Sequence, residues 1–594
     1  MKFSELAVSF NEIDTTASRN EMTSMLANLF KKATPEELEK ITYLSLGRLA
    51  PLYEPVEFGM ADKSVVMALS RAFDINQTEL TKDLKSLGDV GELARKVAKN
   101  DNFNESVMEV FEKLYQLAME HGAGSVERKS IILADLLRDA DEVSAKYLAK
   151  IPTGKLRLGF SDMTILDALS VMEVGDKSIK KTLENFYNLG PDLGRISKIF
   201  KQKGLKGLSG NLIKVGTPVL MARCERLNDA KEILEKSGGK VALEPKYDGF
   251  RLQVHLDRKG GLKTRDKDGE IISAKVKLFT RNLEDVTYMY PDIVEGTLKE
   301  VKADRAIFEG EALAYEESTG EFRPFQETVQ RKRKHGIEAK VLEIPLRLFV
   351  FEFLYSDGVS LIDEPYEKRR ETMRKSFNQG EVVVLSEEVV ATTEKEIEDY
   401  FVREIERGLE GIVAKKLDGG YQAGARGWNW IKYKRGFSGK NLTDTIDCVV
   451  LGYDYGSGKR AKFGIGDFLI GVYDEENDCF TTIAKVGTGL TDEEWVNIRE
   501  SLDEIKTDGI PKNVVVKKLA EVDVWADPQI VVVIRADEIT NSPMHTTAEK
   551  DGLGLALRFP RLIEFGRKDK KPTDATSVKE IISMYNGQKK QKST

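Results

Sequence analysis

The chain has 594 residues, of which 41% are hydrophobic and 32% charged, and its formal net charge is -7. At about 150 residues per domain, this length predicts roughly three or four domains rather than one. No apolar run reaches the roughly 18 residues of a transmembrane helix, which excludes such a span. The acidic total excludes only a uniformly basic nucleic-acid binder, because a basic face can lie on an acidic body.

The cysteine pattern excludes another group of proteins. Cys224, Cys448 and Cys479 lie far apart in the chain and form no CxxC pair. They predict neither a zinc site nor a disulfide framework, which fits a reducing compartment. The first residues carry acidic side chains and no apolar signal core, so we expect a cytoplasmic protein with no membrane partner.

Residues 1–212 carry almost only helix signals. Thr34-Pro35-Glu36-Glu37 predicts a helix start, with threonine as the N-cap, proline at the first helical position and glutamate after the first turn. The segments SVMEVFEKLYQLAMEH and TILDALSVMEV repeat apolar residues at i, i+3 and i+4, which is typical of amphipathic helices. We therefore expect an all-α first domain.

The pattern changes near residue 241. Through residue 436, β-rich runs such as LRLFVFEFLY alternate with helical stretches such as EKEIEDYFVREIERG, which predicts a mixed, antiparallel α/β domain over 213–436. Within it, residues 258–278 predict an extended hairpin. Over 437–594, short β-rich runs recur between glycine-containing turns and predict an all-β barrel or sandwich that ends in a helix.

A charged cluster on the first strand of the middle domain is the first candidate for chemistry. It reads Glu244-Pro245-Lys246-Tyr247-Asp248-Gly249. Alternate residues of a strand share a face, so Glu244, Lys246 and Asp248 should project together. Pro245 and Gly249 predict a strand edge that runs into a turn. Taken alone, the cluster fits a surface ion-pair ladder as well as a lysine nucleophile, which needs nearby cations, metals or burial to lower its pKa.

The lysine, aspartate and glycine of this cluster, followed by Arg251, resemble the nucleotidyl-acceptor motif of the covalent nucleotidyltransferases: DNA ligases, RNA ligases and mRNA capping enzymes. Further segments resemble the remaining motifs of that superfamily, in its order. They are FTRNLEDVT with Arg281, FEGEALAY with Glu311, FVFEFLYSDG with Phe351, EGIVAKK with Glu410 and Lys415, WIKYK with Lys432 and Lys434 preceded by Arg426, and ALRFPR with Arg558 and Arg561. Singly, Phe351 fits a core residue and the lysines a solvated strand face, but the ordered set favours the resemblance.

The resemblance implies a role for each of these residues. Lys246 is the catalytic nucleophile that takes AMP from ATP, and Glu311 and Glu410 are the carboxylates that hold Mg²⁺, a cation that prefers oxygen ligands. The implied nucleotide contacts are Glu244 and Phe351 at the adenine, together with Arg251, Arg281, Glu311, Arg426, Lys432, Lys434 and Arg558. Lysine and arginine suit this task, because phosphoryl transfer depends on positioning and on neutralised phosphate charge.

The helical region distinguishes among members of the superfamily. PTGKLRLGFSDMTILDALS (152–170) and GDVGELARKV (88–97) resemble the DNA-binding domain of archaeal and eukaryotic replicative DNA ligases. The resemblance implies an ATP-dependent DNA ligase that seals nicks in duplex DNA through lysyl-AMP and 5′-adenylated DNA, in replication, repair and recombination. The implied architecture is a helical DNA-binding domain (1–212), a nucleotidyltransferase domain (213–436) and an OB-fold domain (437–594), in a monomer.

Partners beyond nicked DNA follow less directly. Arg195, Lys198 and Lys201 lie three residues apart with no acid between them, and form a helix face that either tracks a DNA backbone or is merely solvated. A sliding clamp is a candidate partner for this class, but the sequence has no clear glutamine-x-x-aliphatic-x-x-aromatic-aromatic box.

Three other classes of protein are alternatives to this interpretation. A capping enzyme or RNA ligase would share the core motifs but not the helical region. An NAD-dependent DNA ligase should carry a cysteine-rich zinc module, and only three separated cysteines are present. A non-catalytic DNA-binding scaffold would have no reason to combine Lys246, Glu311, Glu410 and Lys432. A covalent adduct with labelled ATP, GTP or NAD would separate these classes.

Overall fold

The computed structural model describes residues 1–594 except 17, 157, 210–212, 228, 268, 317–320, 324–326, 329, 334–335, 435–436, 439–440, 443–444, 457–462, 489 and 593–594. The chain divides into two compact units. Unit 1 comprises Met1–Leu220, Lys263–Ile272 and Leu283–Asp285, and unit 2 comprises Met221–Leu262, Ser273–Asn282 and Val286–Thr594. Within the described residues, no helix has both the length and the apolar character that crossing a membrane requires.

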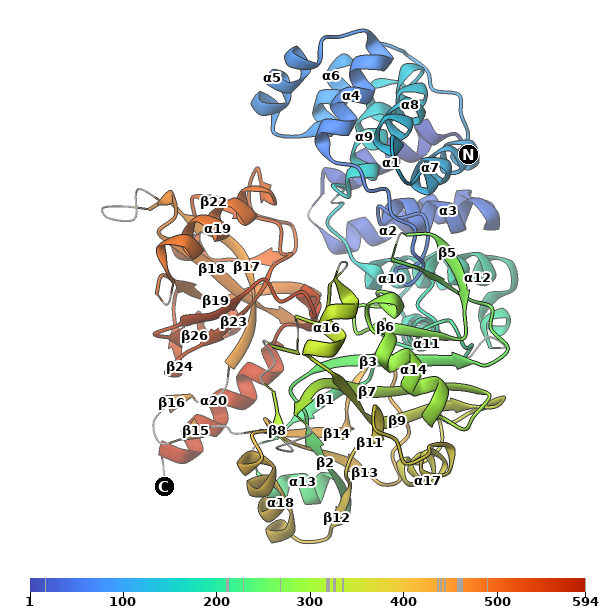
Figure 1. The fold of residues 1–594 in the computed structure, drawn as a ribbon. Coiled ribbons are helices and arrows are strands. Elements are labelled where there is room, and N and C mark those ends of the chain that lie inside the picture. The colour runs from blue at the N-terminus through green and yellow to red at the C-terminus, as the bar shows by residue number, and fades with distance from the viewer. Residues whose placement is uncertain are drawn as a thin grey trace. The chain divides into compact units, whose positions relative to one another are not determined.

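Unit 1 is dominated by helices, which Figure 1 draws in blue to cyan, and the predicted helical N-terminal region is confirmed. Its α-helices are α1 (Phe3–Asp14), α2 (Arg19–Lys32), α3 (Pro35–Ser45), α4 (Asp62–Phe73), α5 (Gln77–Leu87), α6 (Val90–Val97), α7 (Val107–Met119), α8 (Ser125–Arg138), α9 (Glu142–Lys150), α10 (Asp162–Val174), α11 (Lys180–Leu189) and α12 (Leu193–Leu208). One continuous core of buried apolar residues runs from Phe3 to Leu208.

The predicted start of α3 is confirmed, and α7 begins in a similar way. The burial of α10 differs from its predicted amphipathic pattern. Thr34 caps α3 by accepting a hydrogen bond from the amide of Glu37, whose side chain returns a bond to the cap, as predicted. Ser106 caps α7 in the same way. The prediction of an amphipathic helix at 164–174 was wrong, because α10 is buried on nearly all sides, including Asp167 and Ser170.

Two β-sheets form the first part of unit 2. One has the order β1 (Arg223–Arg226), β14 (Arg426–Lys434), β13 (Gly411–Lys416), β2 (Val241–Lys246) and β12 (Val389–Ala391). The other has the order β10 (Val359–Ser360), β9 (Leu346–Ser356), β7 (Arg305–Glu316), β3 (Phe250–Asp257) and β6 (Val276–Thr280), with β11 (Val383–Leu385) beside β9 and β8 (Glu321–Phe322) beside β7. The predicted hairpin is formed by β4 (Leu262–Arg265) and β5 (Ile271–Ala274), and most of it belongs to unit 1.

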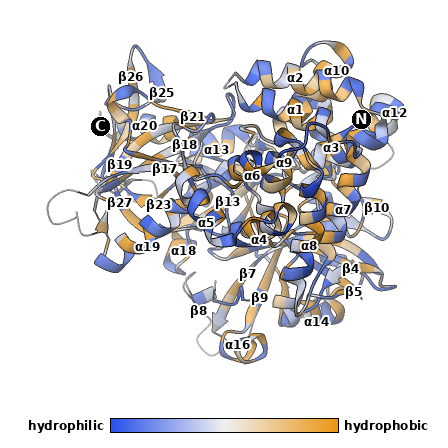
Figure 2. Cartoon of the chain, turned by 90° about the horizontal axis from the view of Figure 1, so that it is seen from above, coloured by the Kyte–Doolittle hydropathy of each residue, from blue (hydrophilic) through white to orange (hydrophobic). Residues whose placement is uncertain are grey.

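Helices cover these sheets and complete their cores. They are α13 (Ala230–Lys236), α14 (Pro291–Glu300), α17 (Tyr366–Ser376) and α18 (Glu394–Glu406). The short helix α16 (Ile337–Glu343) contains no buried residue. Ile397 and Tyr400 of α18 join the core of the first sheet, and Met373 of α17 joins that of the second. Figure 2 shows apolar stretches on these elements interrupted by polar residues. Not all polar residues face solvent, since Gln253 and His255 of β3 are fully buried.

The last part of unit 2 is rich in β-structure, as predicted. Its larger sheet contains β17 (Thr445–Asp454), β18 (Asp467–Asp474), β19 (Cys479–Val486), β20 (Lys506–Thr507), β21 (Val514–Val515), β22 (Val524–Ala526), β23 (Val531–Arg535) and β27 (Arg561–Phe565). A smaller sheet contains β24 (Glu538–Ser542), β26 (Leu553–Arg558) and β25 (Thr547–Lys550). Helices α19 (Asp492–Asp503) and α20 (Val578–Lys592) contribute Trp495 and Ile581 to the core between the strands.

A buried ion pair makes a testable contribution to the stability of unit 2. Arg369 of α17 donates to both carboxylate oxygens of Glu352 on β9 at 2.8 and 3.0 Å, and each side chain is only 1% exposed. We expect Arg369→Ala to lower the free energy of unfolding by about 3–5 kcal/mol, because an uncompensated carboxylate stays buried. Urea unfolding followed by tryptophan fluorescence measures this, since all four tryptophans lie in unit 2.

The matched control for this prediction is an exposed pair. Lys395 and Asp399 on α18 have side chains that are 81% and 65% exposed, so Lys395→Ala should leave the free energy of unfolding almost unchanged. Equal losses in the two variants would contradict the role given to the buried pair.

Candidate active site

The register of three neighbouring strands gathers charged residues on one face of the first sheet. Strand β13 lies between β2 and β14, and Gly411 pairs with both Lys246 and Lys434. Two residues further along β13, Val413 pairs with both Glu244 and Lys432. Because alternate residues of a strand share a face, both rows point to the same side.

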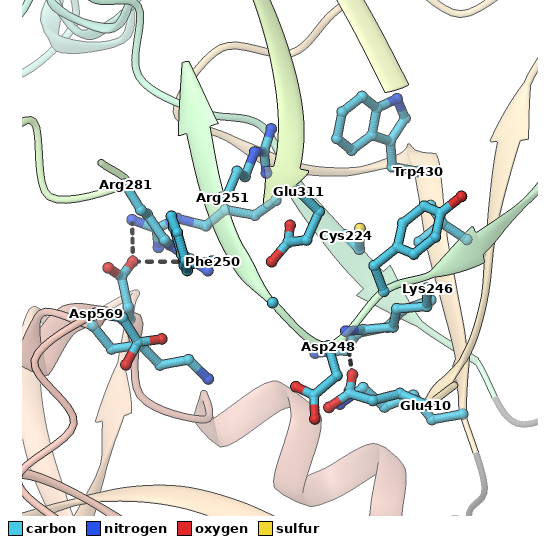
Figure 3. Close-up of a pocket in the computed structure, with 18 of the residues that line it drawn as sticks. Cys224, Lys246, Asp248, Phe250, Arg251, Arg281, Glu311, Glu410, Trp430 and Asp569 are labelled. Atoms are coloured by element: carbon cyan, nitrogen blue, oxygen red, sulfur yellow. Dashed lines mark hydrogen bonds and ion pairs between the residues drawn. The ribbon is translucent and has the colours of Figure 1, made fainter. Parts of the chain in front are cut away.

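This face lines a cavity of about 300 Å³ within unit 2. The second sheet supplies the opposite wall, through Phe250 and Arg251 of β3, Glu311 of β7 and Phe351 of β9. The other predicted site residues that line it are Glu244, Lys246, Arg281, Glu410, Arg426, Lys432 and Lys434. Figure 3 shows Lys246 and Glu410 facing each other across a dashed line, with Glu311 and Arg251 on neighbouring strands.

The turn after Lys246 has a structural reason for its proline and glycine. Strand β12 pairs with β2 only as far as Leu243. Pro245 lies beyond this pairing, so the amide hydrogen that proline lacks is not needed for a hydrogen bond to β12. A Cβ atom at Gly249 would lie 2.3 Å from the carbonyl oxygen of Ala312, so only glycine allows this approach of backbone to backbone. The predicted strand edge running into a turn is therefore present.

Lys246 forms an ion pair with Glu410, the residue directly before β13. The ammonium group of Lys434 lies 3.0 Å from the same carboxylate. Burial would raise the pKa of Glu410, but the charges of Lys246 and Lys434 outweigh it and hold this pKa well below its usual range. An ionised carboxylate therefore lies between two lysines at the bottom of the cavity.

Glu311 and Asp248 are the other carboxylates beside Lys246. Burial raises the pKa of Glu311 from 4.5 to about 7, although the charges of Lys246 and Arg251 oppose this shift. Burial and the charge of Glu410 also raise the pKa of Asp248. No cluster of three or more His, Cys, Asp or Glu side chains that could hold a metal occurs among the described residues. Mg²⁺ needs only one or two carboxylates when waters and phosphate oxygens complete its ligands, so Glu311 and Glu410 fit it.

The other end of the cavity is aromatic. The rings of Phe351 and Trp430 meet edge to face with centroids 6.0 Å apart. The ammonium group of Lys415 lies 4.5 Å from the Trp430 ring centroid and donates to the backbone oxygen of Phe351 at 2.6 Å. Flat apolar rings beside the buried carboxylate of Glu244 are suited to a planar base that carries hydrogen-bond donors.

Arg251 is fixed against the aromatic end by the second sheet. Its guanidinium donates to Glu309 at 2.5 Å and to the backbone oxygen of Ala222 at 2.8 Å. It lies 5.1 Å from the ring centroid of Phe351 and 5.4 Å from that of Trp430. Burial opposes its charge, but the charge of Glu309 outweighs this and raises the pKa of Arg251, which stays a cation.

Acidic residues near the C-terminus pair with the remaining predicted cations. Glu580 of α20 forms ion pairs with Lys432 and, at 2.8 Å, with Arg426. Asp574 lies 3.2 Å from Arg281 and 3.3 Å from Arg223. These cations lie in the wall of the cavity, so the C-terminal carboxylates hold the positions that an anion would take.

One predicted site residue is not brought to the cavity, and others there were missed. Arg558 lies at the end of β26, where it pairs with Glu538 at 2.7 Å, and it is not part of the lining. Arg567 and Lys570 line the cavity instead. The signal that could have revealed them is the basic run GRKDKK directly after the last strand (566–571). Trp430 was also missed, although it precedes Lys432 by two residues on the same strand face.

The basic face predicted on unit 1 is mostly engaged internally. Lys198 lies 3.2 Å from Glu39, and Lys201 donates to the backbone oxygens of Phe30 and Lys31 at the end of α2. The face therefore contributes to helix packing and capping, which reduces the charge it can offer to a DNA backbone.

Comparison with known proteins covers nearly the whole chain. Three family descriptions match it: "DNA ligase N terminus" over residues 2–170, "ATP dependent DNA ligase domain" over 218–434 and "ATP dependent DNA ligase C terminal region" over 461–570. A "Probable DNA ligase" of Dictyoglomus turgidum is 48% identical over 593 residues, covering 100% of this chain and 99% of that protein. A "DNA ligase 2" of Thermofilum pendens is 41% identical over 609 residues, covering 99% and 98%. Among solved structures, mycobacterial DNA ligase D complexed with ATP and MES aligns with a TM-score of 0.33 and 23% identity over 60% of this chain and 98% of that one.

Proposed function

Because the chain belongs to the family of ATP-dependent DNA ligases, we propose that it seals nicks in duplex DNA with Lys246 as the residue that carries AMP. The Nζ atom of Lys246 attacks the α-phosphorus of ATP, a phosphorus–nitrogen bond forms, and the bond to the pyrophosphate leaving group breaks. AMP then passes to the 5′-phosphate at the nick and frees the lysine. The neighbouring 3′-hydroxyl displaces AMP and completes the phosphodiester bond.

The single observation that carries this proposal is the arrangement around Lys246. Two strand rows place Lys432 and Lys434 beside it, while Glu311 faces it from the second sheet. Lysines and arginines neutralise phosphate oxygens, and neutralised, well-positioned phosphate is what phosphoryl transfer requires. Glu244 and Lys246 are two residues apart on one strand face. This separation along β2 suits a nucleotide whose base lies between Phe351 and Glu244 and whose phosphates lie near Lys246.

Metal and leaving-group contacts complete the proposed roles. Glu311 and Glu410 would hold Mg²⁺, which supplies neutralisation of phosphate charge when bound. Glu410 is also the partner of Lys246, so any new ligand of that carboxylate competes with the ion pair. Arg281, Arg426 and Lys432 would contact phosphate or sugar oxygens once Asp574 and Glu580 release them. We assign to Arg567 and Lys570 the nucleotide contact that the resemblance had implied for Arg558, and within it the contact with the leaving pyrophosphate.

Several finer assignments belong to the same proposal. We divide the chain into a DNA-binding domain (1–212), a nucleotidyltransferase domain (213–436) and an OB-fold domain (437–594), which the boundaries of the three family matches support. The OB-fold assignment is supported by the antiparallel pairing of β23, β17, β18 and β19 in one sheet. We further propose a cytoplasmic, nucleoid-associated monomer, with a sliding clamp as a candidate partner.

A sealing assay tests the proposed function. A duplex with one nick and a labelled 5′-phosphate is incubated with the protein, Mg²⁺ and either ATP, GTP or NAD, and the product is separated on a denaturing gel. We expect a lengthened strand with ATP and little with NAD or GTP. Sealing that needs NAD, or no sealing with any nucleotide, would overturn the proposal.

The C-terminal carboxylates give a further prediction. Glu580→Gln removes the charge that pairs with Lys432 and Arg426, so these cations become available to ATP phosphates without first breaking an ion pair. We expect the ATP concentration for half-maximal adenylation to fall about threefold to tenfold, since a charged contact is worth about 1 kcal/mol where it is partly buried. A titration of adenylation rate against ATP measures it.

The control for this prediction removes an equal charge that does not touch the cavity. Glu476 pairs with Lys579 of α20 and is 71% exposed, so Glu476→Gln should leave the ATP dependence unchanged. A rise in the half-maximal ATP concentration for Glu580→Gln would show that Glu580 helps to assemble the site rather than to occupy it.

A further inference from the structure

The carboxylate of Glu244 is held from behind by residues that lie outside the cavity. The hydroxyl of Tyr366 on α17 donates to its Oε1 atom at 2.5 Å, and Arg370, one turn further along α17, lies 3.5 Å from the same atom. Glu244 lines the cavity, whereas neither Tyr366 nor Arg370 does. All three side chains are at least 95% buried, so water does not compete for these contacts.

A second carboxylate completes the network behind Glu244. Glu388 accepts a hydrogen bond from Tyr366 at 2.8 Å and forms an ion pair with Arg370, whose Nε atom lies 2.8 Å from the same carboxylate oxygen. A tyrosine hydroxyl has one proton, so Tyr366 can donate to Glu244 or to Glu388 but not to both at once. Arg370 spans the two carboxylates and supplies the positive charge that lets them lie close together.

On its other side Glu244 meets Lys415. The Nζ atom of Lys415 lies 3.0 Å from the Oε2 atom of Glu244 and donates to the backbone oxygen of Phe351 at 2.6 Å. One carboxylate oxygen is therefore fixed by α17 and the other by a lysine that also fixes the aromatic end of the cavity. The orientation of Glu244 relative to the ring of Phe351 is set by these contacts.

An ionised carboxylate accepts hydrogen bonds and cannot donate them. Because Glu244 lines the cavity, its remaining lone pairs would accept from a base edge that carries a donor, such as the amino group at C6 of adenine. They repel an edge that carries an acceptor, such as the oxygen at C6 of guanine, because the buried acceptor atoms would be left unpaired.

Resting on the proposed function, we propose that Tyr366 and Arg370 are positioning residues that aim the carboxylate of Glu244 at the C6 amino group and so determine the preference for ATP over other purine nucleotides. They belong to none of the sequence motifs that identify the active site. Their effect is exerted through Glu244, without contact to the nucleotide.

The test compares two substrates that differ only in the C6 amino group. The second-order rate constant for formation of the covalent AMP adduct is measured on the full-length protein with ATP and with purine riboside 5′-triphosphate, which has hydrogen at C6. For Tyr366→Phe we expect the ATP rate constant to fall about tenfold, the usual effect of losing a hydrogen bond to a charged group. The rate constant of Tyr366→Phe for the analogue should stay within about twofold of that of the unchanged protein. The analogue has no amino group that could donate a hydrogen bond to Glu244.

A matched control and a second variant keep the test decisive. Tyr400 is buried on α18, and its hydroxyl donates to no partner within the described part of the chain, so Tyr400→Phe should leave both rate constants unchanged. Arg370→Lys keeps the charge but loses the fork that spans both carboxylates, and we expect the same selective loss as for Tyr366→Phe. It replaces Tyr366→Phe if that variant fails to fold.

The outcomes separate this inference from the function on which it rests. Equal losses on both substrates, or no loss on either, would overturn the positioning role while leaving the ligase assignment intact. Failure of the unchanged protein to form any adduct with ATP would instead overturn the proposed function.

Discussion

Lys246→Ala should reduce formation of the covalent AMP adduct by at least about 10⁴-fold, because removing a catalytic nucleophile is among the largest effects a single substitution can have. The side chain lies at the end of β2 between Glu410 and the second sheet, and no other lysine occupies that position. Lys434, the neighbouring ammonium group at Glu410, starts from a different strand and cannot take over the same line of attack. Labelled AMP retained on the denatured protein measures the effect.

Two controls define what the loss means. Lys240 is exposed just before β2, so Lys240→Ala should retain full adduct formation. Supplied with a nick whose 5′-phosphate already carries AMP, Lys246→Ala should still join the strands, because the lysine has no nucleophilic task in that step. Normal adduct formation by Lys246→Ala, or failure of the final step together with the first, would contradict the role given to this lysine.

Glu311→Gln should lower the Mg²⁺-dependent rate of adduct formation by about 10²-fold, the usual effect of removing one charged group that stabilises a phosphoryl transition state. The amide has nearly the same volume, so packing between β3 and β7 should survive. The surface variant Glu295→Gln, on α14, provides the control for a lost charge far from the cavity. A Glu311→Gln enzyme with normal rates at every Mg²⁺ concentration would contradict the metal role.

The pH dependence tests the same residue independently. The pKa of Glu311 is raised from 4.5 to about 7, so protons compete with Mg²⁺ for this carboxylate below that value. The Mg²⁺ affinity should therefore rise as pH increases toward about 7 and then level off, and Glu311→Gln should remove the rise. The same shift affects stability in the opposite direction, because the folded protein, with its raised Glu311 pKa, binds more protons than the unfolded chain. The resulting stabilisation is complete below pH 4.5 and is lost as the pH rises through about 7.

The sequence predicted the helical region and the strand that carries Lys246, and all of the candidate site residues except Arg558 line the cavity. These features depend on local patterns and on residues in a recognisable order. Thr34 and Ser106 cap their helices as the capping pattern requires. The spacing of Glu244 and Lys246 predicted a shared face, and both line the cavity. Such features are encoded within a few residues of one another.

What the sequence did not predict depends on contacts between distant segments. The pairing of Glu580 with Lys432 joins residues that are 148 positions apart, and nothing in either segment indicates it. The amphipathic pattern of α10 did not reveal that both of its faces are buried, since that depends on the helices packed around it. Arg558 was expected at the cavity because ALRFPR resembles the last motif of the superfamily, whereas Arg567 and Lys570 of the run at 566–571 line it instead.

The most direct measurement is to locate the AMP group on the protein. The full-length chain is incubated with ATP and Mg²⁺, digested, and its peptides are analysed by mass spectrometry, with and without later addition of pyrophosphate. We predict one AMP group on the Nζ atom of Lys246 and its removal by pyrophosphate, because the first step runs backwards when the leaving group is supplied. AMP on another residue, or no AMP on any peptide while nicks are still sealed, would contradict the central claim.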